Sequence, residues 1–172
     1  ADRIFVSALN SNDYAATESK LQQALSLRGN SDIYHTAMAR AYLVRASQLA
    51  QETKPDVQAV TDFLARAVNE ARVATDISPH AVAIWENLAT MYDNASQLVP
   101  EAVGWSIKSL NQASELEPTN PVLMWRLGNG YMLQNNFAKA IEYYQKSINL
   151  KKDYVGAYVS LTSAYESGKE LD

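Results

Sequence analysis

Residues 121–153 read PVLMWRLGNGYMLQNNFAKAIEYYQKSINLKKD, and this stretch has the pattern of two helices joined by a tight turn. Before Asn135 and Asn136, and again after them, apolar and small residues recur with the spacing of one helix face. These residues are Met124, Leu127, Gly128 and Tyr131 in the first segment, and Ala140, Ile141, Tyr144 and Ile148 in the second. Because Gly128 and Ala140 are small, we expect the two helices to approach closely at these positions.

The stretch resembles a tetratricopeptide repeat, in which a unit of about 34 residues carries an aromatic residue, Leu-Gly and Tyr on its first helix. Leu127, Gly128 and Tyr131 match this pattern, whereas Met124 stands in place of the leading Trp and Lys152 in place of the closing Pro. The resemblance implies an all-α, right-handed superhelical solenoid of antiparallel helix pairs. Over the whole chain it implies about eight or nine helices.

Weaker copies of the pattern occur on both sides of this unit. We therefore predict one domain over residues 1–172, divided into units 1–31 (partial), 32–81, 82–120, 121–154 and 155–172 (partial). Unit 32–81 exceeds the usual length by sixteen residues, which adds about two turns to each of its helices. We expect this long pair to project past its neighbours. Unit 82–120 is five residues too long, and we place that excess in a loop over residues 94–101.

Stop and start signals place the individual helices. Ser31 or Asp32 is expected to cap one helix, and Thr119 or Asn120 another, with Pro121 at its first position. The expected helices before that proline cover residues 2–10, 14–27, 33–51, 57–77, 82–94 and 101–116.

Composition excludes several classes of function. The net charge of −4 is small and scattered, so we expect no nucleic-acid partner. No apolar run is long enough to span a bilayer, and the absence of Cys removes thiolate chemistry. His35 and His80 are the two histidines, which are too few for a metal site, and no catalytic pattern is visible. We expect His35 to be partly buried, His80 to face water, and no cofactor. The chain begins without Met, and we interpret it as a piece of a longer protein.

The resemblance also implies a binding surface, because the first helices of such repeats line a concave groove. Carried onto this chain, the groove positions give a candidate set for partner binding: Arg40, Glu86, Asn87, Thr90, Trp125, Arg126, Asn129 and Met132. Side-chain amides can bond an extended peptide backbone, and arginine can pair with a carboxylate. Thr36 occupies a position where members that clamp a peptide C-terminus carry Lys, so we do not expect that clamp.

Aromatic residues divide into a groove candidate and core candidates. Trp125 lies beside the aromatic core position and is expected to face the groove, with packing around Met91 or Asn94 as the alternative. The expected core aromatics are Trp85, Tyr92, Tyr131, Tyr144, Tyr158 and Tyr165. An uncapped face at the last helix is a candidate for dimerisation.

The functional hypothesis is a non-catalytic scaffold that binds a peptide or helix of a partner protein in the groove. One alternative rests on residues 85–90, 101–106 and 116–121, which are similar to the repeat tails of bacterial O-antigen ligase-like or polymerase-like membrane proteins. It implies an accessory domain on the extracytoplasmic face of a bacterial membrane, which suits the missing Cys, with a cytoplasmic location as the alternative. The other alternative is a glycan-binding surface formed by Arg40, Asn87, Trp125 and Arg126.

Overall fold

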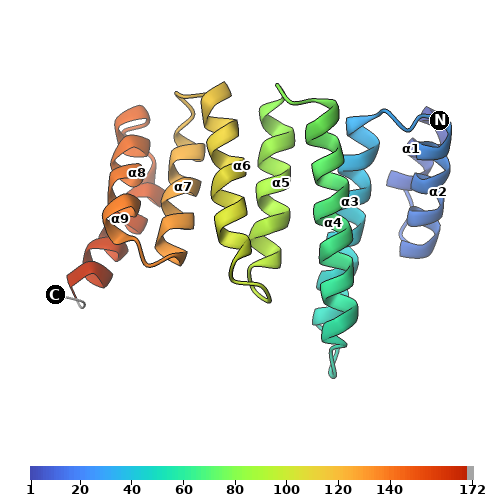
Figure 1. The fold of residues 1–172 in the computed structure, drawn as a ribbon, viewed down its shortest axis with the longest axis horizontal. Coiled ribbons are helices and arrows are strands. Elements are labelled where there is room, and N and C mark those ends of the chain that lie inside the picture. Colours follow the sequence, from blue (N-terminus) through green and yellow to red (C-terminus); the bar gives the residue numbers. More distant parts are fainter. Residues whose placement is uncertain (170–172) are drawn as a thin grey trace.

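The computed structural model describes residues 1–169, which form nine α-helices and no strand (Figure 1). Residues 170–172, the end of the predicted unit 155–172, lie outside the described residues. The helices are α1 (Asp2–Leu9), α2 (Tyr14–Leu27), α3 (Asp32–Ala50), α4 (Val57–Ile77), α5 (Val82–Ala95), α6 (Ala102–Leu116), α7 (Pro121–Leu133), α8 (Phe137–Leu150) and α9 (Val155–Lys169). These bounds agree with the predicted helices to within two residues. The division into one domain of five units stays a prediction.

Side-chain caps explain where several helices begin. Ser31 accepts a hydrogen bond from the backbone N–H of Tyr34, and Asn120 accepts from the first turn of α7, where Pro121 follows it. The turn between α7 and α8 is tight because Asn135 adopts φ 55°, a conformation that asparagine tolerates better than most residues. Short polar residues therefore fix where these helices begin.

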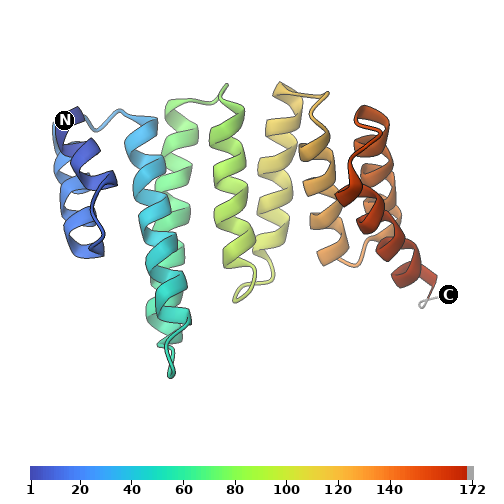
Figure 2. The ribbon, with the colours of Figure 1, turned by 180° about the vertical axis from the view of Figure 1, so that it is seen from behind.

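The helices form antiparallel pairs that stack side by side (Figures 1 and 2). Within the part of the chain described, the first helices α3 and α5 contact each other, as do α7 and α9, whereas α4 and α6 have no comparable contact. At these two places the stack is therefore closer along its first helices. We call their shared face the concave groove and the opposite face the convex side.

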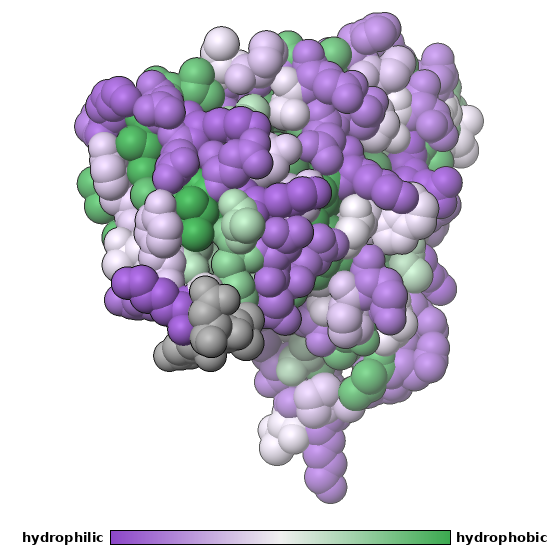
Figure 3. All heavy atoms as spheres, turned by 60° about the vertical axis from the view of Figure 1, so that its left-hand side comes forward, coloured by the Kyte–Doolittle hydropathy of each residue, from purple (hydrophilic) through white to green (hydrophobic). Residues whose placement is uncertain are grey.

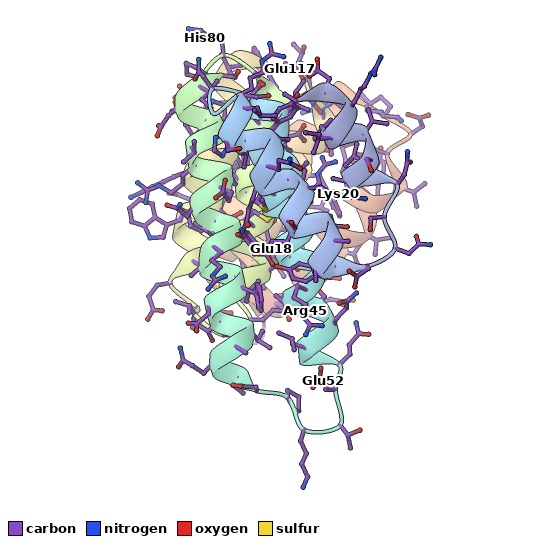
Figure 4. The ribbon with its side chains drawn as sticks, turned by 90° about the vertical axis from the view of Figure 1, so that its right-hand side faces the viewer. Glu18, Lys20, Arg45, Glu52, His80 and Glu117 are labelled. Carbon is purple, nitrogen blue, oxygen red and sulfur yellow. The ribbon has the colours of Figure 1, made fainter. Side chains whose placement is uncertain are left out.

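The α3–α4 pair projects beyond its neighbours, as the sixteen extra residues of unit 32–81 predicted (Figure 1). Figure 4 views the molecule from the α1–α2 end, with Glu52 at the tip of this hairpin and His80 at the opposite end of α4. His80 is exposed, as expected. The projecting segment has its own small core, formed by Ala46, Leu49, Val60 and Leu64.

The contact between α7 and α8 is close at Gly128. A Cβ atom added there would lie 2.4 Å from Cε1 of Tyr144, whose ring is buried. Ala140 is also fully buried. The expected close approach is therefore present, and the Tyr144 ring fills the space that the missing side chain leaves.

The prediction that six aromatic residues lie in the core is wrong for two of them. Tyr144 is buried, and Trp85, Tyr92 and Tyr131 are half-buried against core clusters, but Tyr158 is 45% exposed and Tyr165 44%. The reason is that α9 packs on α7 and α8 through its small residues, Ala157 and Ala164, and no other described helix covers its outer side. Figure 3 faces this end of the stack, where hydrophobic side chains lie among hydrophilic ones.

Candidate functional site

The candidate set lies on α3, α5 and α7, three successive first helices that line the concave groove. The structure brings its members together in three separate groups rather than in one continuous row. The three groups differ in whether their polar atoms already have hydrogen-bond partners within the chain. This difference decides which donors and acceptors remain for a ligand.

Arg126 is the centre of the first group and bridges α7 to α5. Its Nη2 donates to Oδ2 of Asp93 at 3.0 Å and to Oγ1 of Thr90 at 3.1 Å. Its Nη1 donates to the backbone oxygen of Glu86 at 3.4 Å, with the Glu86 carboxylate at 3.8 Å. Only 18% of the Arg126 side chain is exposed. Most of the N–H donors of Arg126 are therefore engaged inside the chain. The carboxylate that it pairs with belongs to Asp93 of the same chain rather than to a ligand.

Replacing Asp93 by Asn is expected to lower the free energy of unfolding by about 0.5–1 kcal/mol, because the ion pair is lost while one partner is partly exposed. Urea unfolding at low and at high salt measures this, and the deficit should shrink at high salt. Asp62→Asn is the matched control, since Asp62 is an exposed helical residue bonded only to Gln58. Equal losses in the two variants would contradict the role given to the Arg126 pair.

Trp125 packs toward the C-terminal end of the groove. Its indole N–H donates to Oγ of Ser160 on α9 at 2.9 Å, and its ring meets Tyr154 edge to face at a centroid distance of 5.9 Å. The neighbour it packs on is therefore α9 rather than Met91 or Asn94 of α5. The structure leaves the ring half-buried, and contact with a ligand stays a prediction.

Asn129 and Met132 complete this C-terminal group. The Tyr144 hydroxyl donates to Oδ1 of Asn129 at 2.8 Å, and burial raises the pKa of Tyr144, so that the hydroxyl keeps its proton. This bond occupies the oxygen of the Asn129 amide and leaves its NH₂ group as the donor for a ligand. Met132 is half-buried against the cluster of Ala140, Tyr144 and Ala164. Met132 therefore contributes to packing, and its contact with a ligand stays a prediction.

Arg40 and Asn87 form the third group, between α3 and α5. Nε of Arg40 donates to Oδ1 of Asn87 at 3.5 Å. Asn87 is only 7% exposed, and its Nδ2 has no hydrogen-bond partner among residues 1–169. The hydroxyl of Thr36, one helical turn before Arg40, is likewise buried and without a partner in this part of the chain. Buried polar groups are rarely left in this state.

A cavity of about 240 Å³ opens beside Arg40, between the α1–α2 turn and α3. Leu9, Tyr14 and Val44 contribute to its walls, and Asn12 to its rim. Sequence reasoning missed this cavity. It counted Thr36 as a groove position, by resemblance, but did not include it in the candidate set. No residue pattern could have revealed the cavity, since it depends on how α1 and α2 are placed against α3.

His35 is bonded at both ring nitrogens. Nδ1 lies 2.6 Å from Oε2 of Glu70 on α4, and Nε2 lies 3.0 Å from the backbone oxygen of Gly29. The ring is partly buried, as expected, and links α3 to its partner helix and to the preceding loop. Within residues 1–169, no three His, Asp or Glu residues form a group that could hold a metal ion. None of the described helices is both long and apolar enough to cross a membrane.

Comparison with known proteins supports the repeat assignment. Residues 121–154 match the family model of the tetratricopeptide repeat, the same unit that the sequence motif identified. The fold class is confirmed as an all-α solenoid of helix pairs like those of tetratricopeptide repeat proteins. No curated protein matches the chain in sequence.

Solved structures with the same fold share little sequence with this chain. The structure of the MamA protein has a TM-score of 0.73 at 18% identity, over 97% of this chain and 80% of that one. A thermophilic tetratricopeptide repeat protein of Thermus thermophilus has a TM-score of 0.68 at 16% identity, over 88% and 73%. The first repeat domain of Spaghetti bound to an HSP90 peptide has a TM-score of 0.53 at 14% identity, over 77% and 94%. These likenesses establish the fold.

Proposed function

We propose that this chain is a non-catalytic scaffold that binds a segment of a partner protein in its concave groove, at Thr36, Arg40 and Asn87. The observation that carries the proposal is the pair of buried, unpartnered polar groups at this place, Nδ2 of Asn87 and the Thr36 hydroxyl. A tetratricopeptide repeat fold is generally a protein-binding scaffold, and one protein of similar fold was solved with a peptide bound.

An extended peptide fits the chemistry of this group. Leaving a buried donor without a partner costs about 1–3 kcal/mol. Both atoms are buried in the free chain, so a ligand gains that energy on binding when the two side chains turn toward it. A peptide backbone offers a carbonyl to accept from Asn87 and an N–H to donate to Thr36. Arg40 is exposed beside them and suits an acidic side chain of the same ligand.

The Arg126 group plays a different part in this proposal. Because Asp93, Thr90 and Glu86 already engage its guanidinium, we assign Arg126 to holding α7 against α5. The same bonds weigh against the glycan alternative, in which Arg126 and Trp125 were two of the four binding groups and both have partners within the chain. The accessory-domain hypothesis concerns the rest of a longer protein, and transmembrane segments encoded in the same gene would support it.

The test is Asn87→Leu, which removes the unpartnered Nδ2, together with the long bond from Arg40 to Oδ1, and puts an apolar side chain of similar size in its place. Stability should stay the same or rise by up to about 2 kcal/mol, because the unsatisfied donor is removed. Partner binding should fall at least tenfold. A pull-down from the native organism's extract identifies the partner, and titration of a peptide from it into both proteins measures the affinity.

Glu86→Gln is the matched control within the groove, since its backbone oxygen, which bonds Arg126, is unchanged. It should retain the partner. If Asn87→Leu bound the peptide as tightly as the wild type, the binding site would lie elsewhere. If Glu86→Gln lost it as completely, the Arg126 group would be the site instead.

A further inference from the structure

A second cleft lies on the convex side, between α4 and α6, with α5 as its floor. Both of these second helices pack on α5, whereas α4 and α6 have no comparable contact with each other within the described chain. Two cavities, of about 290 Å³ and 540 Å³, follow one another along this cleft and share Tyr92 and Trp105 in their walls. We call it the convex cleft. It shares no residue with the candidate set in the groove.

The lengthened unit 32–81 and the lengthened unit 82–120 both contribute residues to the same end of this cleft. Leu64 comes from the N-terminal half of α4, in the lengthened hairpin, and Leu98 and Val99 come from the longer loop between α5 and α6. With Val68 they form an almost entirely apolar wall. Leu98 and Val99 remain substantially exposed, although their neighbours are apolar. The extra residues thus build an apolar surface and leave it open.

Trp105 stands between the two cavities and is 53% exposed, whereas Trp85 and Trp125 are half-buried. Its ring stacks on Tyr92 at a centroid distance of 6.3 Å and an angle of 27°, and Nζ of Lys108 lies 4.1 Å from its centroid. A large aromatic ring, held in place by neighbours and open to solvent, is the kind of residue that dominates protein-binding energy.

The other end of the cleft is more polar and carries a cation on each wall. Arg72 projects from α4 and Lys108 from α6, with Asp76 as the acidic residue among the lining groups. Neither Arg72 nor Lys108 has an ion-pair partner within 4 Å in residues 1–169; those found involve other residues. The excess of positive charge at this end favours a partner that brings carboxylates.

We propose that the convex cleft binds an amphipathic α-helix of a partner protein, with large apolar residues at the Leu98 end and Asp or Glu residues at the Arg72 end. An extended strand is the poorer fit, because the apolar wall offers almost no hydrogen-bonding group to its backbone, whereas a helix satisfies its own. The lining residues of α4 run from Thr61 to Asp76. At about 1.5 Å per residue, this wall accommodates a helix of roughly four turns.

A selection from displayed helical peptides tests the proposal with a defined probe. The library holds 16-residue helices with Leu fixed on one face and the other positions random, and the wild-type chain is the bait. We expect enrichment of helices with acidic residues toward one end. Affinities of selected peptides, measured by fluorescence anisotropy, should fall at least tenfold for Trp105→Ala. Lys108→Glu should reverse the preference from acidic to basic ends. Leu133→Ala, which removes an exposed leucine on α7, should change nothing.

Three results would overturn the proposal. One is the absence of enrichment over a Trp105→Ala bait, and another is an acidic preference that Lys108→Glu leaves intact. The third is self-association in sedimentation velocity that Trp105→Ala abolishes, which would make a second copy of the chain the occupant. Asn87→Leu should bind the selected helices as the wild type does, so failure of the groove proposal and failure of this one are distinguishable.

Discussion

Gly128→Val should destabilise the chain by about 3 kcal/mol or more. A Cβ atom at this position would lie 2.4 Å and 2.5 Å from two ring carbons of Tyr144, and the added methyl groups would need further space. Tyr144 cannot move aside easily, because it is buried and its hydroxyl is bonded to Asn129. Overfilling a packed core costs about 1–3 kcal/mol for small additions, and a whole branched side chain exceeds that.

Gly104→Ala is the matched control for this prediction. Gly104 is also helical, in the first turn of α6, but an added Cβ would meet nothing nearer than Nε2 of Gln134 at 3.8 Å. Alanine there should raise stability by about 0.5–1 kcal/mol through helix propensity alone. Urea unfolding followed by circular dichroism measures both variants. Similar stabilities for the two would mean that the α7–α8 contact at Gly128 is looser than described.

Leu127→Ala should have an effect of similar size, about 2–5 kcal/mol, by leaving a cavity. Leu127 is fully buried in a cluster to which α5, α6 and α7 all contribute, through Ala89, Ile107 and Leu123 among others. This cluster joins two helix pairs. Loss of the Leu127 side chain should therefore lower the midpoint of the main unfolding transition rather than let one helix unfold separately. Chemical unfolding monitored by helical content measures it.

Leu133→Ala is the control, because it makes the same substitution in the same helix, six residues further along α7, and so has a similar effect on helix propensity. Its side chain is 64% exposed, so the change should stay within about 0.5 kcal/mol. A loss below about 1 kcal/mol for Leu127→Ala would contradict the coupling of the pairs. An early separate transition confined to the C-terminal helices would contradict it as well.

The two proposed surfaces lie on opposite sides of the same helix, α5. Asn87 faces the groove, whereas Tyr92 forms part of the convex cleft. In these proposals the groove binds an extended segment through buried hydrogen-bonding groups. The convex cleft binds the apolar face of a helix, which packs against Trp105. A scaffold with both surfaces could engage two segments of one partner, or two partners, at the same time.

Sequence reasoning placed the helices almost to the residue, because the signals that start and stop a helix are local. Ser31 and Asn120 bond to backbone N–H groups within three residues of themselves, and proline excludes helix-interior positions without reference to the rest of the chain. The excess of unit 32–81 over the usual repeat length can also be counted in the sequence, so the projecting α3–α4 pair could be predicted. Gly128 was identified as a contact point for the same reason, since its size is a property of the residue.

The partners of each polar or aromatic side chain were decided by the tertiary structure alone. Helical periodicity predicts which face of a helix turns inward, but not what it meets there. Arg126 finds Asp93 on another helix, and Asn87 finds no group for its Nδ2 among the described residues, although both occupy predicted groove positions. Tyr158 and Tyr165 match the core pattern yet remain exposed, because burial requires a neighbouring surface as well as a pattern. The chain determines its helices locally, whereas which groups are left to bind a ligand depends on contacts between residues far apart in sequence.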